Sequence, residues 1–191
     1  MKENTRVILA NSLKDLLHRK PFNKITVEDI TNNANLSRMT FYYYFSDIFA
    51  LVEWVCDEGA KDVLINNKSS DTWQNAFLNI FNILLEDKVF FTNLCINIDR
   101  LELEKYLYSI TYDLMKKAIC DMDESKGISE ANINFIADFY KYAFVGIILD
   151  WIQNYMKDDP KVIINKVDLV IRGNVKACLL RIQEDDSEVS N

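Results

Sequence analysis

Apolar residues recur along most of the chain at the three- and four-residue spacing that is typical of amphipathic helices. The first segment keeps this spacing at Val7, Ala10, Leu13 and Leu17. The longest pattern runs from Ser129 to Tyr155 without a helix breaker, and Asp159-Pro160 begins a last helix that is predicted to continue to Arg181. Only 4 Gly and 2 Pro occur in 191 residues, which disfavours turn-rich β folds. The sequence therefore predicts an all-α protein.

Two short helices joined by a tight turn are predicted near the N-terminus. Thr26 is an expected N-cap, and the acidic Asp29 three residues later makes a variant of the capping box. This helix is predicted to end near Asn33, and Asn35 is a residue type that adopts the positive φ of a tight turn at low cost. Ser37 is then the expected N-cap of the next helix. The pattern is that of a helix-turn-helix.

The second helix of this pair has two different faces. At about 100° per residue, Phe41 and Phe45 share one side, which is expected to be core. The residues that point largely the other way are Met39, Thr40, Tyr42 and Tyr43. The tyrosines could instead form a hydrophobic face with hydroxyl groups at its rim, but three successive tyrosines cannot all face one core. A polar, aromatic outer face is what a recognition helix places in the major groove.

The net charge of −7 is divided unevenly along the chain. Residues 1–52 carry seven Lys/Arg and five Asp/Glu, whereas the remainder carries 15 and 24. The first segment is therefore at +2 and the rest at −9. An anionic partner is expected for the first segment, although a charge of this size is a weak signal without the motif.

The reactive side chains argue against catalysis. His18 is the single histidine, which removes schemes built on an imidazole, and it is expected to lie at a helix C-terminus. The cysteines are far apart in sequence, at positions 56, 95, 120 and 178, so neither a zinc pair nor a disulfide framework is predicted. We interpret them as reduced core thiols, with a redox sensor as the alternative. The sequence predicts no metal, no cofactor and no enzymatic activity.

No membrane association is expected. The first residues lack a sustained apolar segment with a cleavage site. The most apolar stretch, Tyr142 to Leu149, is far shorter than the ~20 residues that span a bilayer. The prediction is a cytoplasmic protein.

The segment KPFNKITVEDITNNANLSRMTFYYYF closely resembles the N-terminal domain of the tetracycline-repressor (TetR) family of transcriptional regulators. The resemblance covers about residues 3–55 and is strongest from Leu36 to Phe45. The rest of the chain is similar to the family's helical effector and dimerisation domain, most of all in the branch with regulators of dihydroxyacetone kinase operons. The implied domains are a three-helix helix-turn-helix DNA-binding domain at 1–52 and an effector-binding and dimerisation domain at 53–183. Residues 184–191 are predicted to be a disordered acidic tail.

The same resemblance implies which residues meet DNA. The predicted DNA-binding residues are Thr26, Ser37, Arg38, Met39, Thr40, Tyr42, Tyr43 and Tyr44. Thr26 would donate to a phosphate as well as cap its helix, and Arg38 can form a fork to guanine. Tyr42 and Tyr44 would touch backbone phosphates, and Tyr43 would reach base edges or a thymine methyl. Helical phase supports Tyr44 least, because it leans towards the core.

The chain departs from the family pattern at one position of this surface. The family commonly has a lysine at the start of the fourth helix that holds a phosphate, and Ile48 stands there. This anchor is therefore absent, or is supplied by Lys20, Lys24 or the N-terminus of the fourth helix.

The function that the resemblance implies is that of a homodimeric repressor, which binds palindromic double-stranded DNA and is released by an effector. The last two helices would form the dimer, with Gly146 and Gly173 allowing close helix approach. The many aromatic residues and the acidic second segment favour a small apolar or neutral effector, although such residues more often form plain core. The alternative is a C-terminal lobe that binds a partner protein instead of a small molecule.

Overall fold

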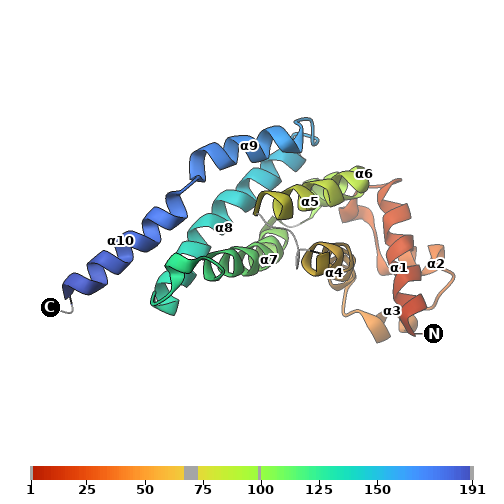
Figure 1. The fold of residues 1–191 in the computed structure, drawn as a ribbon. Helices are drawn as coiled ribbons and strands as arrows, with labels where there is room; N and C mark the ends of the chain where they lie inside the picture. The colour runs from red at the N-terminus through yellow and green to blue at the C-terminus, as the bar shows by residue number, and fades with distance from the viewer. Residues whose placement is uncertain (1, 67–72, 99, 190–191) are drawn as a thin grey trace. The chain divides into compact units, whose positions relative to one another are not determined.

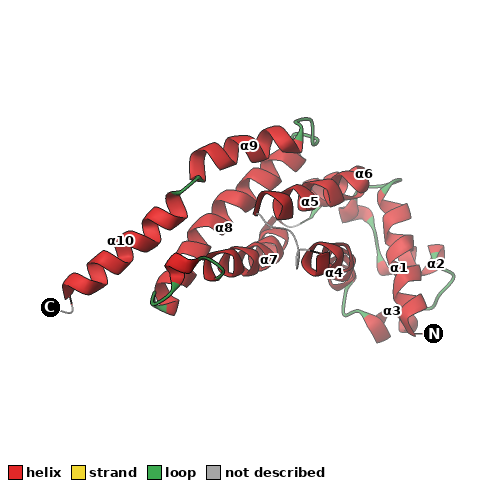
Figure 2. Ribbon diagram, in the orientation of Figure 1, coloured by secondary structure: helices red, strands yellow, loops and turns green. Residues whose placement is uncertain are grey.

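The computed structural model describes residues 2–66, 73–98 and 100–189, and every regular element among them is a helix (Figure 1; Figure 2). The α-helices are α1 (Lys2–Leu17), α2 (Val27–Asn33), α3 (Arg38–Tyr44), α4 (Ile48–Asn66), α5 (Trp73–Glu86), α6 (Lys88–Asn97), α7 (Arg100–Cys120), α8 (Glu130–Gln153), α9 (Pro160–Ile171) and α10 (Asn174–Val189). Two 3-10 turns are η1 (Phe22–Lys24) and η2 (Asp123–Ser125). The predicted all-α class is confirmed. Among the described residues, no helix combines the length and the hydropathy that a transmembrane segment requires.

The chain divides into two compact units. The first comprises Met1–Arg100 and contains α1 to α6, and the second comprises Leu101–Asn191 and contains α8 to α10 with nearly all of α7. The functional boundary predicted after residue 52 falls inside α4. It stays a prediction, because the compact units reflect packing and not the assignment of DNA and effector binding.

One hydrophobic core holds the first four helices together. Leu13, Ile30, Phe41 and Leu51 come from four different helices, and all are fully buried. Helix α6 adds Phe90 and Leu94 to the same core. The helix-turn-helix is therefore packed on α1 and α4, and its core extends to a helix far along the chain.

Ser12 links α1 to α2 from inside this core. Its hydroxyl donates to the backbone oxygen of Ile30 at 2.8 Å and accepts from the side-chain amide of Asn33 at 3.1 Å. A buried hydroxyl with both bonds made fixes the distance between the two helices, because leaving it unpaired would cost about 1–3 kcal/mol.

Asn93 of α6 joins that helix to the end of α1. Its Nδ2 donates to the backbone oxygens of Leu17 at 2.6 Å and Lys20 at 2.9 Å. Its Oδ1 accepts from the backbone N–H of Phe22 at 3.1 Å. One side chain thus satisfies three backbone groups where α1 ends and η1 begins, and no local sequence pattern predicts this contact.

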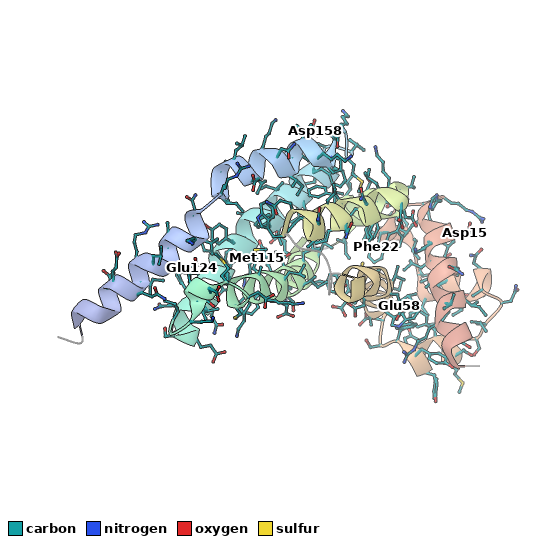
Figure 3. The ribbon with its side chains drawn as sticks, viewed as in Figure 1. Asp15, Phe22, Glu58, Met115, Glu124 and Asp158 are labelled. Atoms are coloured by element: carbon teal, nitrogen blue, oxygen red, sulfur yellow. The ribbon has the colours of Figure 1, made fainter. Side chains whose placement is uncertain are left out.

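The second unit is built around α8. The buried side of α8 consists of Ile133, Ile136, Ala137, Phe144, Val145, Ile148, Leu149, Trp151 and Ile152. The indole N–H of Trp151 donates to the backbone oxygen of Asp158 at 2.9 Å, which secures the loop before α9. Glu124, labelled in Figure 3, lies at η2. It pairs with Lys176 of α10, and its backbone oxygen accepts from Gln183 Nε2 at 3.0 Å.

The prediction of one last helix from Pro160 to Arg181 is wrong. Two helices, α9 and α10, are separated at Arg172 and Gly173. Gly173 has a φ of +75°, a conformation that a residue with a Cβ rarely adopts. Its backbone freedom explains this glycine within the single chain, where a Cβ placed there would have no neighbour within 4 Å. The close helix approach predicted for Gly173 concerns the dimer and stays a prediction.

Helix α10 also continues through Val189, whereas a disordered tail is predicted from Glu184 onwards. The buried Leu179 fixes the helix on the second unit. Extending an existing helix costs far less than nucleating one, so the acidic segment continues it. Residues 190–191 lie outside the described part of the chain.

We expect Phe41→Ala to lower the free energy of unfolding by about 3–5 kcal/mol, because it empties the centre of the shared core. Met39→Ala is the matched control on the same helix. Met39 is 85% exposed, so its removal should change stability by no more than about 0.5 kcal/mol. Chemical denaturation followed by circular dichroism measures both. Equal stability of the two variants would contradict this account of how α3 is held.

Candidate nucleic-acid interface

Helix α3 is fixed at both ends and by one buried residue. Ser37 is its N-cap and accepts from the backbone N–H of Thr40 at 3.0 Å. Phe41 is the only buried residue of the seven in the helix, and Phe45 follows as the C-cap with 6% exposure. Asn35 has a φ of +53° in the turn before it, as predicted. These contacts fix the rotation of α3 about its axis.

The remaining side chains of α3 form an exposed face. Met39, Tyr43 and Tyr42 are 85%, 68% and 51% exposed, and Ser37 and Arg38 are exposed as well. Thr40 and Tyr44 are half-buried, and Tyr44 packs against the core, as its helical phase predicts. The structure thus brings seven of the eight predicted residues together on and around one short helix. Their contacts with DNA stay predictions.

Ser37 and Thr40 together have one hydroxyl hydrogen that is not used in their mutual hydrogen bond. Their hydroxyl oxygens lie 2.9 Å apart, so one hydroxyl donates to the other. The hydrogen of the other hydroxyl is not required for capping the helix, so it can be donated to a phosphate. Oxygen acceptors with negative charge are also favoured at this end of a helix by its dipole.

Thr26 lies apart from this group, at the start of α2, and its hydrogen bonds are already made. The capping box is confirmed: its hydroxyl accepts from the Asp29 N–H at 3.1 Å and donates to the Asp29 carboxylate at 2.7 Å. Bonds from Lys20 and then from Thr26 lower the pKa of Asp29 to about 2. Thr26 would have to redirect its hydroxyl before it could donate to a phosphate.

The three predicted substitutes for the missing lysine at Ile48 differ in availability. Lys20 pairs with Asp29 at 2.8 Å, so its charge is already compensated. The N-terminus of α4 is capped by Asp47, whose Oδ1 accepts from the N–H of Ala50 at 2.8 Å, and this carboxylate repels a phosphate. Lys24 on η1 is exposed. Of the three, only Lys24 keeps an available charge.

Two contacts around α3 were missed by sequence reasoning. The Arg6 guanidinium of α1 lies over the Tyr44 ring at 5.8 Å from its centroid. The Trp54 ring of α4 meets Phe45 edge to face, with ring centroids 6.1 Å apart. Both join residues from different helices, so periodicity along the chain carries no signal for them.

The described residues include no group of three or more His, Cys, Asp or Glu side chains that could hold a metal ion. Burial raises the pKa of the Cys56 thiol to about 12, which leaves it without reactive thiolate at neutral pH. Cys120 is exposed, so the prediction that all four cysteines are core thiols is wrong for this one. It lies at the end of α7, where no core pattern continues.

Comparison with known proteins gives two family matches and several relatives. Residues 11–55 match the family described as "Bacterial regulatory proteins, tetR family", and residues 71–173 match "Transcriptional regulator C-terminal region". The HTH-type dhaKLM operon transcriptional activator DhaS of Lactococcus lactis subsp. lactis (strain IL1403) is 27% identical over 145 residues, which is 75% of this chain and 76% of the relative.

Solved structures show the same fold. The dihydroxyacetone kinase operon activator DhaS superposes with a TM-score of 0.64 at 24% identity, over 94% of this chain and 96% of that one. NalD of Pseudomonas aeruginosa, described as the secondary repressor of the MexAB-OprM multidrug efflux pump, gives 0.64 at 14% identity, over 89% and 94%.

The exposed face of α3 and both family matches agree with the resemblance drawn from the sequence, which is confirmed. Both matched families consist of regulators and not of enzymes. The chain belongs to the tetR family of bacterial transcriptional regulators, in the branch that includes DhaS, and carries its helix-turn-helix DNA-binding domain at the N-terminus.

Proposed function

We propose that this regulator is a homodimeric repressor that binds a palindromic operator and is released by an effector at its C-terminal domain. The observation that carries the proposal is the exposed face of α3, where Arg38, Tyr42 and Tyr43 project from a helix whose rotation is fixed by Phe41. A helix of this kind enters the major groove with its N-terminal residues against base edges.

The side chains of α3 divide into two kinds of contact. Arg38 lies in the first turn of the helix and can donate two parallel bonds to guanine, which reads sequence. Tyr43 offers a ring face for a thymine methyl and a hydroxyl for a base edge. Ser37, Thr40 and Tyr42 have hydroxyl groups that suit phosphate oxygens, which sets the position of the helix without reading sequence.

Dimer formation is supported by an exposed apolar stripe on the second unit. On α8, Phe135, Phe139 and Tyr142 are 72%, 64% and 55% exposed and follow each other at helical spacing. On α9, Leu169 and Val170 are 74% and 72% exposed. A large exposed apolar surface marks an interaction site, and two copies of these helices would cover each other in a four-helix bundle.

Gly146 lies on the exposed side of α8, one helical turn beyond Tyr142. A Cβ built there would meet nothing within 4 Å in the monomer. A glycine inside a helix costs about 1 kcal/mol relative to alanine, so its presence in open space needs a reason. Close approach of a second copy supplies one.

Control of DNA binding would run through the helices that contact α3 and α1. Trp54 of α4 touches Phe45, the C-cap of α3, and Asn93 fastens α6 to the end of α1. A movement of either helix therefore changes the setting of the recognition helix. The acidic charge of the second segment favours a small apolar or neutral effector over a polyanion.

The relatives differ in whether they are named activators or repressors. DhaS of Lactococcus lactis is named an activator, and NalD of Pseudomonas aeruginosa is named a repressor. For this chain we propose repression, so deletion of its gene should raise expression from a promoter that contains the operator. A fall in expression would instead assign activation.

Selection of bound fragments from the host's DNA, with and without an extract of cell metabolites, tests the proposal. Recovery of one palindromic sequence that the extract releases is the expected result. If the metabolites leave binding unchanged while a copurifying protein alters it, the C-terminal lobe binds a partner protein instead.

We expect Arg38→Ala and Tyr43→Ala each to weaken operator binding by about 1–3 kcal/mol without loss of stability, because both residues are exposed on α3. Arg38→Ala should also relax base preference. Titrations of operator and scrambled duplexes at fixed salt measure both effects. Undiminished affinity in both variants would reject this face as the DNA-reading surface.

We expect wild-type protein to sediment as a dimer at micromolar concentration and Gly146→Leu to shift it towards monomer. Leucine favours the helix more than glycine does, so the loss cannot come from unfolding of α8. Gly146→Ala is the control, because a single methyl group fills far less of the space between close helices. A well-folded wild-type monomer would end the proposal of a dimer.

A further inference from the structure

The cations of the DNA-binding helices differ in whether an acid already compensates them. Three of them are paired: Lys14 with Asp87 at 3.7 Å, Arg19 with Asp15 at 2.7 Å, and Lys20 with Asp29 at 2.8 Å. Among the side chains that the structure describes in residues 5–52, the cations without a carboxylate in salt-bridge distance are Arg6, Lys24 and Arg38. Within the described side chains of residues 5–52, these three have a positive charge that no carboxylate compensates.

Two of these three cations are close to α3. Arg38 is the first residue of α3, and Arg6 lies over Tyr44, its last residue. At 1.5 Å per residue, the Cα atoms of Arg38 and Tyr44 are about 9 Å apart along the helix axis, so the two arginines mark opposite ends of α3. Lys24 lies on η1, before α2.

The Tyr44 ring holds Arg6 in place without using its donors. A guanidinium that lies over an aromatic ring keeps its N–H groups in its own plane, where they remain available to an anion. Tyr44 in turn meets Tyr43 edge to face, with ring centroids 4.9 Å apart, and Tyr43 is 68% exposed. Arg6, Tyr44 and Tyr43 thus form a continuous row that ends on the exposed face of α3.

We propose that Arg6, which lies over the Tyr44 ring, binds a phosphate of the DNA backbone at the end of the recognition helix opposite Arg38. The inference rests on the proposed operator binding and adds a residue to it. A planar fork of N–H donors matches phosphate oxygens well. The site takes the place of the missing lysine at Ile48 beside α3, because Lys20 is paired, Asp47 occupies the N-terminus of α4, and Lys24 lies on η1, before α2.

The test is the salt dependence of DNA binding by wild type, Arg6→Ala and the control Arg19→Ala. Arg19 is an exposed arginine of the same N-terminal region, and Asp15 pairs with it, so its removal changes net charge equally. Affinities for the selected operator and a scrambled duplex are measured across a series of NaCl concentrations. We expect the slope of log K against log salt to fall by about 0.9 per protomer in Arg6→Ala and to stay unchanged in Arg19→Ala.

A phosphate contact also predicts that Arg6→Ala lowers the affinity for both duplexes by the same factor, since such a contact reads no bases. Arg6→Lys should keep the wild-type slope, because the released counterion depends on charge. Thermal unfolding of each variant confirms that α1 is intact. If Arg6→Ala keeps the wild-type salt slope, or loses affinity for the operator alone, the Arg6 site is wrong. Neither result would contradict operator binding itself. Absence of any operator preference in wild type would overturn the proposed function itself.

Discussion

The burial of Phe41 is the interaction on which the DNA-binding surface depends. A helix as short as α3 is not stable alone in water, since isolated helices need at least about 12–15 residues. Its stability comes from burying Phe41 and Phe45 in the core cluster that also contains Leu13 of α1 and Ile30 of α2. That packing leaves one rotation of α3, and the exposed residues follow from it. The recognition face is therefore a consequence of the core.

The same core explains why the DNA-binding helices are sensitive to the rest of the first unit. Phe90 and Leu94 of α6 complete it, and Asn93 between them carries three backbone groups at the end of α1. Apolar packing alone tolerates small sliding, but these hydrogen bonds have fixed directions. A shift of α6 must either break them, at about 1–3 kcal/mol for each unpaired group, or move the end of α1 with it.

Local features of the fold could be predicted from the sequence, and features that join distant segments could not. The capping box at Thr26, the turn at Asn35 and the cap at Ser37 depend on residues within three positions of each other. The break at Gly173 was missed because the apolar spacing of α9 and α10 continues across it. Asn93 and the contact of Arg6 with Tyr44 arise only from packing. The candidate site was thus predictable for α3 itself and not for its neighbours.

The distribution of charge matters more for this surface than its sum. Residues 1–52 carry a net charge of only +2, which alone would give weak attraction to DNA. Ion pairing changes how this charge is distributed. Carboxylates compensate Lys14 and Lys20, whereas Arg6 and Arg38, at the two ends of α3, have no carboxylate partner in the part of the chain that the structure describes. Asp29 stays ionised down to a pH of about 2, so Lys20 remains paired throughout the neutral range. The acids thus leave the available positive charge on Lys24 and at the two ends of the proposed recognition helix.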